Sequence, residues 1–390
     1  MPAVDVAIVG GGVSGVSTAA FLSEAGLRVR LYERTAIAAG ASGRNSGIVQ
    51  HPFDPVLAGL YRLTLAEYRI LADASDGGFV FGAAPAGLLY VGHDPGLAER
   101  TALEWAAAWP ATLPQVVAGP DLRALEPGLA ADLAACRLDV GYPVAPAAAT
   151  EAFALLARRR GVEFVIGADA RPAIEGGRVV GVALDGRIEP AGAVVVAAGP
   201  WTPELVDPTG AWRPIRPSWG VVATVMLDAA PRHGLEAIDI TIEPGDEPAV
   251  RTADDAVEFS LVPAAGSSAL GSTFLPEEPD PAAWVDALRR VGARYVPRLV
   301  DAPVVAVRCC ARPVSLDGRP LVGPVPWADG LWVLAGHGPW GISTGPGSAR
   351  LIARAILADD AAATPADLGV HRFGSPGSPP GQRQEFGSNR

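Results

Sequence analysis

The sequence contains no lysine: all 31 of its basic residues are arginine. A Schiff-base lysine, a Walker-type phosphate-binding lysine and a lysine general base are therefore excluded. Cysteine is almost as scarce, and Cys136, Cys309 and Cys310 can form neither a disulfide framework nor a zinc site. The apolar runs, such as residues 193–198, are too short to span a bilayer, so we expect no transmembrane segment.

The net charge of -11 at pH 7 argues against a nucleic acid or an anionic membrane as partner, because both need a basic face. Hydrophobic residues make up 49% of the 390 residues, enough for one large domain or two ordinary ones. The first apolar run begins at Val4 and leaves no room for a signal peptide, which predicts a cytoplasmic protein. Ser, Pro, Gly and Gln dominate the end of the chain, which predicts a disordered tail over 370–390.

The N-terminal segment has the pattern of one βαβ unit. Residues 4–9 form a short apolar run typical of a buried parallel strand, residues 16–25 suggest a helix, and residues 27–32 suggest a second strand. In the loop between strand and helix, Gly10 permits a tight turn and Gly12 lets the backbone approach a pyrophosphate. Gly15 lets the helix pack closely on the strand.

The helix that begins beside Val13 and Ser14 would present its free N–H groups and positive dipole end to phosphate groups. Glu33 follows the second strand, 18 residues after Gly15, where a carboxylate can accept hydrogen bonds from ribose hydroxyls. An acidic residue there disfavours the 2′-phosphate of NADP. The loop thus indicates a bound dinucleotide, and both NAD and FAD fit it.

A second polar, glycine-rich stretch follows Glu33 and Arg34. It contains Ser42, Gly43, Arg44, Asn45, Ser46 and Gly47. Such a stretch suits a ligand that lies extended across the sheet, as FAD does, and on composition alone it also fits a flexible surface loop.

Signals of the dinucleotide domain recur along the chain, with strand-rich segments between them. The run at residues 193–198 and the strand at 331–334, followed by a helix over 347–358, have the same α/β character as the N-terminus. We therefore predict a mixed α/β protein whose Rossmann-like FAD-binding domain comprises residues 1–50, 145–213 and 309–369. A mixed-sheet substrate domain, residues 51–144 and 214–308, is interleaved with it.

Three segments of the chain resemble the D-amino acid oxidase superfamily of FAD-dependent oxidoreductases, which includes glycine oxidase, sarcosine oxidase and D-amino acid dehydrogenase. They are residues 8–47, residues 194–201, and residues 312–341 with the Asp317-Gly318-Arg319-Pro320 sequence. The resemblance implies FAD as cofactor and a hydride passing to it from a carbon that bears an amine, or less often a hydroxyl. An imine formed in this way then hydrolyses.

Several side chains are candidates for the chemistry. Arg312 matches the family's arginine before a proline, and its planar fork suits a substrate carboxylate, although an arginine that only holds the Asp317-Gly318 turn would look the same. His51 could serve as a base beside the flavin, or lie in a surface loop. His337 lies in a glycine-rich segment that is expected near the flavin's pyrimidine end, and it could equally be a packing residue.

Cys310 occupies a place similar to that of the flavin-linked cysteine of sarcosine oxidase, but we favour a buried strand cysteine and non-covalent FAD. The complete set of expected cofactor-binding residues is Gly10, Gly12, Val13, Ser14, Gly15, Glu33, Arg34, Ser42, Gly43, Arg44, Asn45, Ser46, Gly47, Ala198, Gly199, Trp201, Arg312, Gly336, Gly338, Pro339, Trp340, Gly341 and Ile342.

The leading prediction is an FAD-dependent oxidoreductase for an amino acid or secondary amine that carries a carboxylate. The alternatives are oxidation of a 2-hydroxy acid by the same fold and a flavin subunit of a larger dehydrogenase complex. Dioxygen or another electron acceptor would complete the reaction. The lysine that promotes reaction with dioxygen in sarcosine-oxidase relatives has no counterpart here. Its absence slightly favours a dehydrogenase that uses another electron acceptor over an oxidase.

Overall fold

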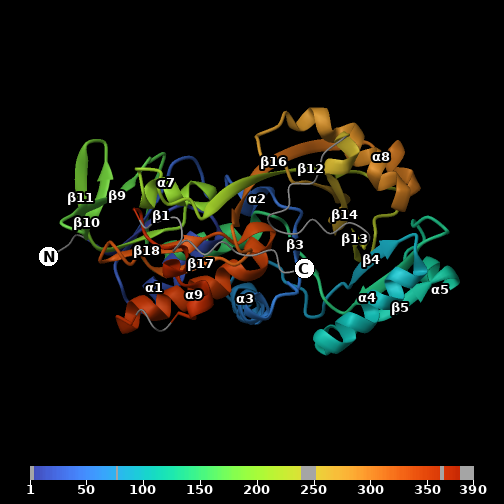
Figure 1. The fold of residues 1–390 in the computed structure, drawn as a ribbon, viewed down its shortest axis with the longest axis horizontal. Helices are drawn as coiled ribbons and strands as arrows, with labels where there is room; N and C mark the ends of the chain where they lie inside the picture. The colour runs from blue at the N-terminus through green and yellow to red at the C-terminus, as the bar shows by residue number, and fades with distance from the viewer. Residues whose placement is uncertain (1–3, 76–77, 239–251, 361–363, 378–390) are drawn as a thin grey trace.

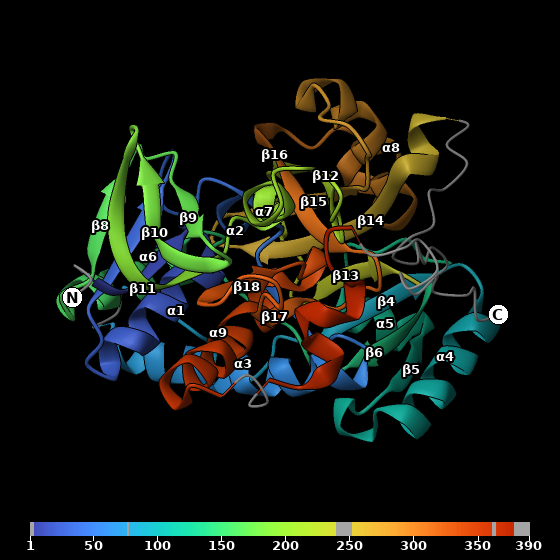
Figure 2. The ribbon, with the colours of Figure 1, turned by 60° about the vertical axis from the view of Figure 1, so that its left-hand side comes forward.

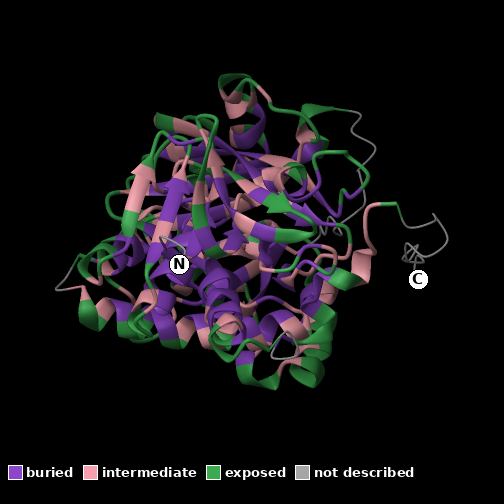
Figure 3. Cartoon of the chain, turned by 90° about the vertical axis from the view of Figure 1, so that its left-hand side faces the viewer, coloured by how far each residue is buried: buried purple, intermediate pink, exposed green. Residues whose placement is uncertain are grey.

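The computed structural model describes residues 4–75, 78–238, 252–360 and 364–377 (Figure 1). Two eight-stranded sheets lie side by side, each with its own hydrophobic core. Buried residues follow the strands and the inner faces of the helices, while exposed residues lie at the periphery (Figure 3). This is the mixed α/β architecture that the sequence predicts.

The first sheet has the central order β17-β18-β11-β1-β2-β8, and β10 and β9 extend it from β11. Its strands are β1 (Val4–Val9), β2 (Val29–Glu33), β8 (Glu163–Ile166), β9 (Arg171–Glu175), β10 (Arg178–Leu184), β11 (Arg187–Val196), β17 (Leu321–Pro324) and β18 (Leu331–Ala335). Strands β8, β2, β1, β11 and β18 pair in parallel. Their carboxyl ends therefore meet at one edge of the sheet, where ligands bind in α/β folds.

Helices cover the first sheet and explain why its central strands are continuous apolar runs. They are α1 (Val13–Glu24), α3 (Pro55–Ala74), α6 (Ala148–Arg159) and α9 (Gly341–Ala358). Helix α1 packs against α6 and α9, and α3 packs against α9. The βαβ unit formed by β1, α1 and β2 is thus present, with α1 beginning three residues earlier than the apolar pattern suggests.

The second sheet has the order β16-β12-β15-β14-β13-β4-β6-β5. Its strands are β4 (Leu88–Gly92), β5 (Gln115–Ala118), β6 (Ala134–Leu138), β12 (Ile215–Val225), β13 (Gly234–Ala237), β14 (Val257–Ala264), β15 (Ser267–Thr273) and β16 (Val304–Ser315). The β4–β13 pair is parallel and the others are antiparallel, so this is a mixed sheet. Helices α4 (Pro95–Ala108) and α8 (Val285–Tyr295) pack on opposite faces of this sheet, α4 in the cluster that contains Leu88 and α8 in the cluster that contains Phe259. Figure 2 shows α8 next to β14 and α4 next to β5.

Two boundaries differ from the predicted domain division. Helix α3 belongs to the core of the first sheet, although residues 51–144 were expected in the substrate domain. Strand β16 pairs with β12 in the second sheet as far as Ser315, although the dinucleotide domain was expected to resume at 309. Long-range packing decides both points, and the amphipathic pattern of α3 does not say which core its apolar face meets.

Helix α9 begins at Gly341, six residues before the predicted start at residue 347. Pro346 in its second turn explains the difference, because proline has no N–H to donate to the carbonyl of Ile342. The Tyr68 hydroxyl donates to that carbonyl instead, at 2.7 Å. A contact from α3 thus stabilises a helical start that the local sequence disfavours.

The end of the chain is ordered further than predicted. Val370–Phe373 form a short 3₁₀ helix, and Val370 is buried in a hydrophobic cluster of the first sheet. The predicted disordered tail is therefore wrong for residues 370–377, while residues 378–390 lie outside the described residues. None of the described helices is long and apolar enough to cross a membrane.

Candidate active site

A cavity of about 1350 Å³ lies between the two sheets. Its walls are the carboxyl ends of the parallel strands, the starts of α1 and α9, and residues of the second sheet. Typical pockets for one drug-sized ligand measure roughly 300–1,000 Å³, so this cavity has room for a dinucleotide and a small substrate together.

The glycine loop has the close contacts that its sequence predicts. A β-carbon at Gly10 would collide with the carbonyl group of Ala197, and one at Gly15 would collide with the carbonyl oxygen of Gly10. Glu33 accepts a hydrogen bond from the Gly11 N–H at 2.7 Å, and its other oxygen accepts from the Thr35 N–H at 2.8 Å. These bonds hold the carboxylate at the edge of the cavity that it helps to line.

Two helix N-termini point at the same cavity. Neither α1 nor α9 has a side chain of its N-cap residue bonded to its first turn, within the part of the chain that the structure describes. Ser42 accepts a hydrogen bond from the Val13 N–H at 2.9 Å. A β-carbon at Gly345 would lie 3.1 Å from the Ser14 hydroxyl, so the two helix starts lie next to each other. Their combined dipoles favour an anionic ligand here.

The second glycine-rich stretch is folded, which contradicts the alternative of a flexible surface loop. Ala41–Arg44 form the short helix α2. The Asn45 amide donates to the Ala41 carbonyl at 3.1 Å and to the Ser42 carbonyl at 3.0 Å, and its oxygen accepts from the Gly47 N–H at 2.8 Å.

At the Glu33 end of the cavity, the guanidinium of Arg34 lies over the Trp201 ring, 3.9 Å from its centroid. Both residues line the cavity, and they form a flat wall that suits an aromatic base. Residues 168–171 complete this end and were missed by the sequence analysis. They follow β8, whose parallel pairing with β2 places them beside Glu33. The rule that ligands bind at the carboxyl ends of parallel strands would have found them.

Most of the predicted cofactor residues line the cavity. They are Gly10, Gly12, Val13, Ser14, Glu33, Arg34, Ser42, Arg44, Asn45, Ser46, Gly47, Ala198, Gly199, Trp201, Arg312, Gly338, Pro339, Trp340, Gly341 and Ile342. Gly15, Gly43 and Gly336 are not part of the wall formed by the described residues. A β-carbon at Gly43 would collide with the Ala38 carbonyl oxygen, and Gly336 has a φ of +88°, so backbone geometry accounts for these glycines.

Arg312 projects from β16 into the cavity and is fixed in place by three contacts. Its Nη1 donates to the Thr273 carbonyl at 2.7 Å, its Nη2 donates to the Ser272 hydroxyl, and its guanidinium lies 4.3 Å from the centroid of the Phe274 ring. A β-carbon at Gly220 would collide with the guanidinium, so this cation lies flat against the backbone of β12.

The two histidines occupy different environments. His337 lines the cavity, and its Nε2 lies 3.1 Å from Ser348 Oγ, whose hydroxyl donates to the Thr344 carbonyl. Burial lowers the pKa of His337 to about 4, so the ring is neutral at pH 7. His51 is not part of the cavity wall among the described residues, because its ring packs against Phe53, Tyr61 and Trp109. The predicted direct role of His51 beside the flavin is not supported by this placement.

The cysteines of β16 also line the cavity. Cys309 and Cys310 are both buried, and burial raises the pKa of the Cys309 thiol to about 11 and also raises that of Cys310. Thiols in this environment stay protonated at neutral pH, which lowers their reactivity as nucleophiles.

Strands of the second sheet contribute cavity residues that the sequence analysis missed. They are Tyr90, Trp219, Glu236, Glu258, Ser260 and Ser272. No motif marks these positions, because their side chains meet only through the register of strands far apart in the sequence.

Comparison with known proteins identifies the family. The model of the DAO family, described as FAD dependent oxidoreductase, matches residues 5–355. The chain belongs to this family. It is 30% identical to a glycine oxidase of Pseudomonas aeruginosa, over 89% of this chain and 93% of that protein. It is 32% identical to a D-amino acid dehydrogenase of Cereibacter sphaeroides, over 58% of this chain and 50% of that protein.

Solved structures agree with the sequence comparison. The crystal structure of glycine oxidase from Geobacillus kaustophilus superposes with a TM-score of 0.79 at 25% identity and covers 95% of this chain and 98% of that one. The predicted superfamily is thus confirmed, and the protein is an FAD-dependent oxidoreductase. The residues present fit that cofactor, because two adjacent helix starts, an acidic residue at the end of β2 and an Arg34–Trp201 wall occur in one cavity.

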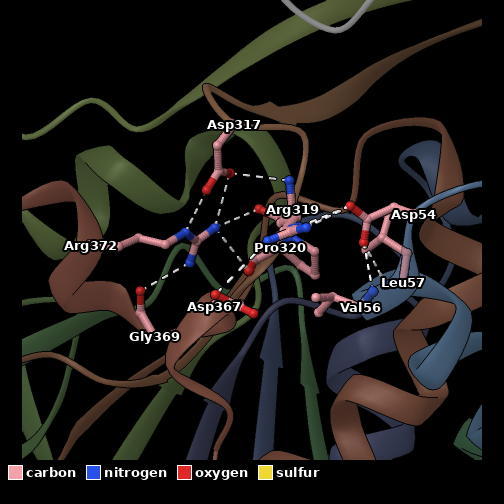
Figure 4. A network of polar contacts seen from close by, with 9 residues as sticks. All are labelled: Asp54, Val56, Leu57, Asp317, Arg319, Pro320, Asp367, Gly369 and Arg372. Carbon is pink, nitrogen blue, oxygen red and sulfur yellow. Dashed lines mark hydrogen bonds and ion pairs between the residues drawn. The ribbon is translucent and has the colours of Figure 1, made fainter. Parts of the chain in front are cut away.

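In this DAO-family chain, the C-terminal 3₁₀ helix anchors a turn of the cavity wall (Figure 4). Arg372 donates to Asp317 at 2.7 and 3.1 Å and to the Arg319 carbonyl at 2.7 Å. Arg319 in turn pairs with Asp54 at 2.8 Å, and the other oxygen of Asp54 caps α3 by accepting from the Val56 N–H at 2.8 Å. These charged side chains thus link the 3₁₀ helix, the cavity wall and α3.

We expect Arg372→Ala to destabilise the protein by roughly 3–5 kcal/mol, because it leaves the carboxylate of Asp317 buried without its partner. The two side chains are only 9% and 10% exposed. Urea denaturation of the FAD-loaded protein measures this loss. Arg100→Ala is the control, since its 3.4 Å pair with Asp94 has both side chains 62% exposed and should contribute less than about 1 kcal/mol. Equal losses in the two variants would contradict a structural role for the buried pair.

Proposed function

We propose that the protein oxidises the α-carbon of an amino acid or secondary amine that carries a carboxylate, giving an imine that hydrolyses. FAD, when bound, accepts the hydride. The observation that carries the proposal is Arg312, an anchored cation within the cavity of a DAO-family fold. The named relatives, a glycine oxidase and a D-amino acid dehydrogenase, support an amino acid as substrate and do not favour the 2-hydroxy acid or complex-subunit alternatives.

Arg312 would bind and orient the substrate carboxylate. A guanidinium has five N–H donors in a planar fork. The bonds to Thr273 and Ser272 fix the plane of the fork, and further N–H groups remain to bind a carboxylate. The Phe274 ring and the backbone at Gly220 lie against the guanidinium and restrict its motion. A cation held in this way loses little further entropy when it binds a carboxylate.

The cofactor-binding residues would act at two places. Glu33 would accept hydrogen bonds from the ribose, and the N–H groups at the start of α1 would bind the pyrophosphate. The start of α9 near Gly341 would stabilise negative charge on the reduced flavin through its dipole. His337, neutral and held at Ser348, would position this segment without carrying a charge.

Anaerobic reduction of the flavin tests the proposed reaction. Amines, D- and L-amino acids and 2-hydroxy acids are added in turn, and loss of the flavin's visible absorbance reports hydride transfer. We expect bleaching by at least one carboxylate-bearing amine. Bleaching by 2-hydroxy acids alone would refute the assignment. Re-admission of air then shows whether dioxygen is the acceptor. The cytoplasmic location stays a prediction.

We propose that FAD is bound without a covalent link, because burial keeps the Cys309 and Cys310 thiols protonated. Acid precipitation of the FAD-loaded protein should leave all flavin absorbance in the supernatant. Flavin that stays with the precipitate in the wild type and is released in Cys310→Ala would overturn this expectation.

A further inference from the structure

Two carboxylates lie together on one face of the second sheet. Glu236 on β13 is directly opposite Ser260 on β14, and Glu258 is two residues from Ser260 on the same strand. The register of β14 is irregular between Val257 and Ser260, and the electrostatic interaction of Glu258 with Glu236 places these two carboxylates near each other. Each of them lines the cavity, so this face looks into the active site.

Aromatic rings lie beside Glu236. Tyr90 on β4 is its direct partner in the parallel β4–β13 register. The Tyr90 ring is 4.8 Å from that of Trp105, and the Trp105 ring stacks on Phe53 at 4.3 Å. Tyr90, Trp105 and Phe53 all line the cavity. Carboxylates next to aromatic faces form the surroundings that favour a cationic ligand.

An unsatisfied acceptor lies at the same place. The side chains of Tyr90 and Gln50 hydrogen-bond to the Glu236 carboxyl, and Gln50 also lines the cavity. The Oε1 atom of Gln50 is buried and has no hydrogen-bond partner among the residues that the structure describes. A buried acceptor without a donor costs roughly 1–3 kcal/mol, so a ligand with N–H donors would remove this penalty.

The charges around Glu236 also favour a cation. Burial and the neighbouring Glu258 raise the pKa of Glu236 to about 7 although Tyr90 and Gln50 hydrogen-bond to it, so a cation bound beside this carboxyl would favour its charged form. Arg312 is on β16, and three strands separate β16 from the β13 strand that carries Glu236. Its guanidinium reaches Ser272 and Thr273 on β15 and interacts electrostatically with Glu258, so Glu236 is the carboxylate farther from this cation. The cavity therefore offers a positive group and a negative group at separate places, which matches a ligand with a carboxylate at one end and a cation at the other.

We propose that Glu236, with Gln50 and the neighbouring rings, binds a second cationic group of the substrate, an ammonium or guanidinium distinct from the amine that is oxidised. The substrate class is then a basic amino acid whose carboxylate lies at Arg312. This inference rests on the proposed function for the orientation of the substrate. The binding of a cation at Glu236 can nevertheless be measured without any turnover.

Calorimetry on the FAD-loaded protein tests the binding of the cation. The probes are ω-amino carboxylates of increasing chain length, each compared with the carboxylate of the same length that lacks the amine. Above a minimum length, the amine should tighten binding roughly ten- to one-hundred-fold, the range expected for a charge-assisted hydrogen bond. Equal affinities at every length would overturn the proposal. Discrimination confined to the shortest probe, glycine, would assign Glu236 to the reacting amine and would also overturn it.

Glu236→Gln tests the residue itself. The variant keeps the shape and removes the charge, so affinity for the amine-bearing probes should fall roughly ten- to one-hundred-fold while affinity for the plain carboxylates stays within about two-fold. Glu99→Gln, at an exposed position of α4 that is not part of the cavity wall among the described residues, is the control and should change neither affinity. A parallel loss for both kinds of probe would indicate a structural role and refute the proposal. If the Glu236→Gln variant does not fold, the calorimetric comparison of amine-bearing probes and plain carboxylates on the wild type is the test of the cation site.

Turnover separates this inference from the proposed function. Flavin reduction by ornithine and lysine, as D- and L-forms, is compared with reduction by norvaline and norleucine. Faster flavin reduction by ornithine and lysine supports both the proposed function and the cation site. If no amine reduces the flavin but the amine-bearing probes still bind more tightly, the proposed function fails and the cation site stands. Reduction by all four at equal kcat/KM supports the proposed function and contradicts the cation site.

Discussion

Arg312→Ala should raise the KM for the substrate steeply and lower kcat/KM by roughly a hundred-fold or more, while FAD stays bound. Removing one partner of a buried charge pair costs about 2–5 kcal/mol, which corresponds to this range. The substrate carboxylate would otherwise enter a cavity that contains Glu236 and Glu258 without its counter-ion. Steady-state kinetics with the best substrate of the panel, together with the flavin content of the purified variant, measure both effects.

Two further variants separate the charge of Arg312 from its geometry. Arg312→Lys keeps a cation but loses the planar fork, so its kcat/KM should lie between those of the wild type and Arg312→Ala. Gly220→Ala leaves Arg312 in the chain but places a methyl group where the guanidinium now lies. It should therefore raise KM as well. An unchanged KM in Arg312→Ala would show that this arginine has only a structural role, through its bonds to Thr273 and Ser272.

Local patterns in the sequence predicted the glycine-loop end of the cavity. The strand, glycine loop, helix, strand and Glu33 are contiguous, and their packing depends on contacts within one βαβ unit. The roles of Gly10 and Gly15 followed from the same unit. Arg312 was found through the family resemblance, and its anchoring on Thr273 and Ser272 was not visible in the sequence.

The substrate half could not be predicted in the same way. Tyr90 and Glu236 become neighbours only because β4 pairs with β13, across more than a hundred residues of chain. A shift of β13 by one residue in that register would turn Glu236 to the face opposite Tyr90, and no short-range pattern fixes the register. The early start of α9 was missed for a similar reason, since the hydroxyl that compensates for Pro346 comes from Tyr68 on another helix.

Gly10→Ala should abolish FAD binding. Gly10 has a φ of +119°, and an added β-carbon would lie 2.7 Å from the carbonyl carbon of Ala197. The strained backbone costs about 1–3 kcal/mol and the overlap with a core strand a similar amount. Because the Ala197 carbonyl cannot move without disturbing the β1–β11 pairing, the glycine loop itself must shift. The N–H groups at the start of α1 would then no longer meet the pyrophosphate.

Gly26→Ala is the matched control for this effect. Gly26 belongs to the same βαβ unit and also has a positive φ, +87°, but no atom of the surrounding described residues lies within 4 Å of the added β-carbon. It should lose only about 1 kcal/mol of stability and retain its flavin. The ratio of flavin absorbance to protein absorbance in the soluble fraction, with thermal unfolding of both variants, separates loss of cofactor from loss of fold. Full flavin occupancy in Gly10→Ala would contradict the proposed place of the pyrophosphate, because the collision arises at the turn that should lie closest to it.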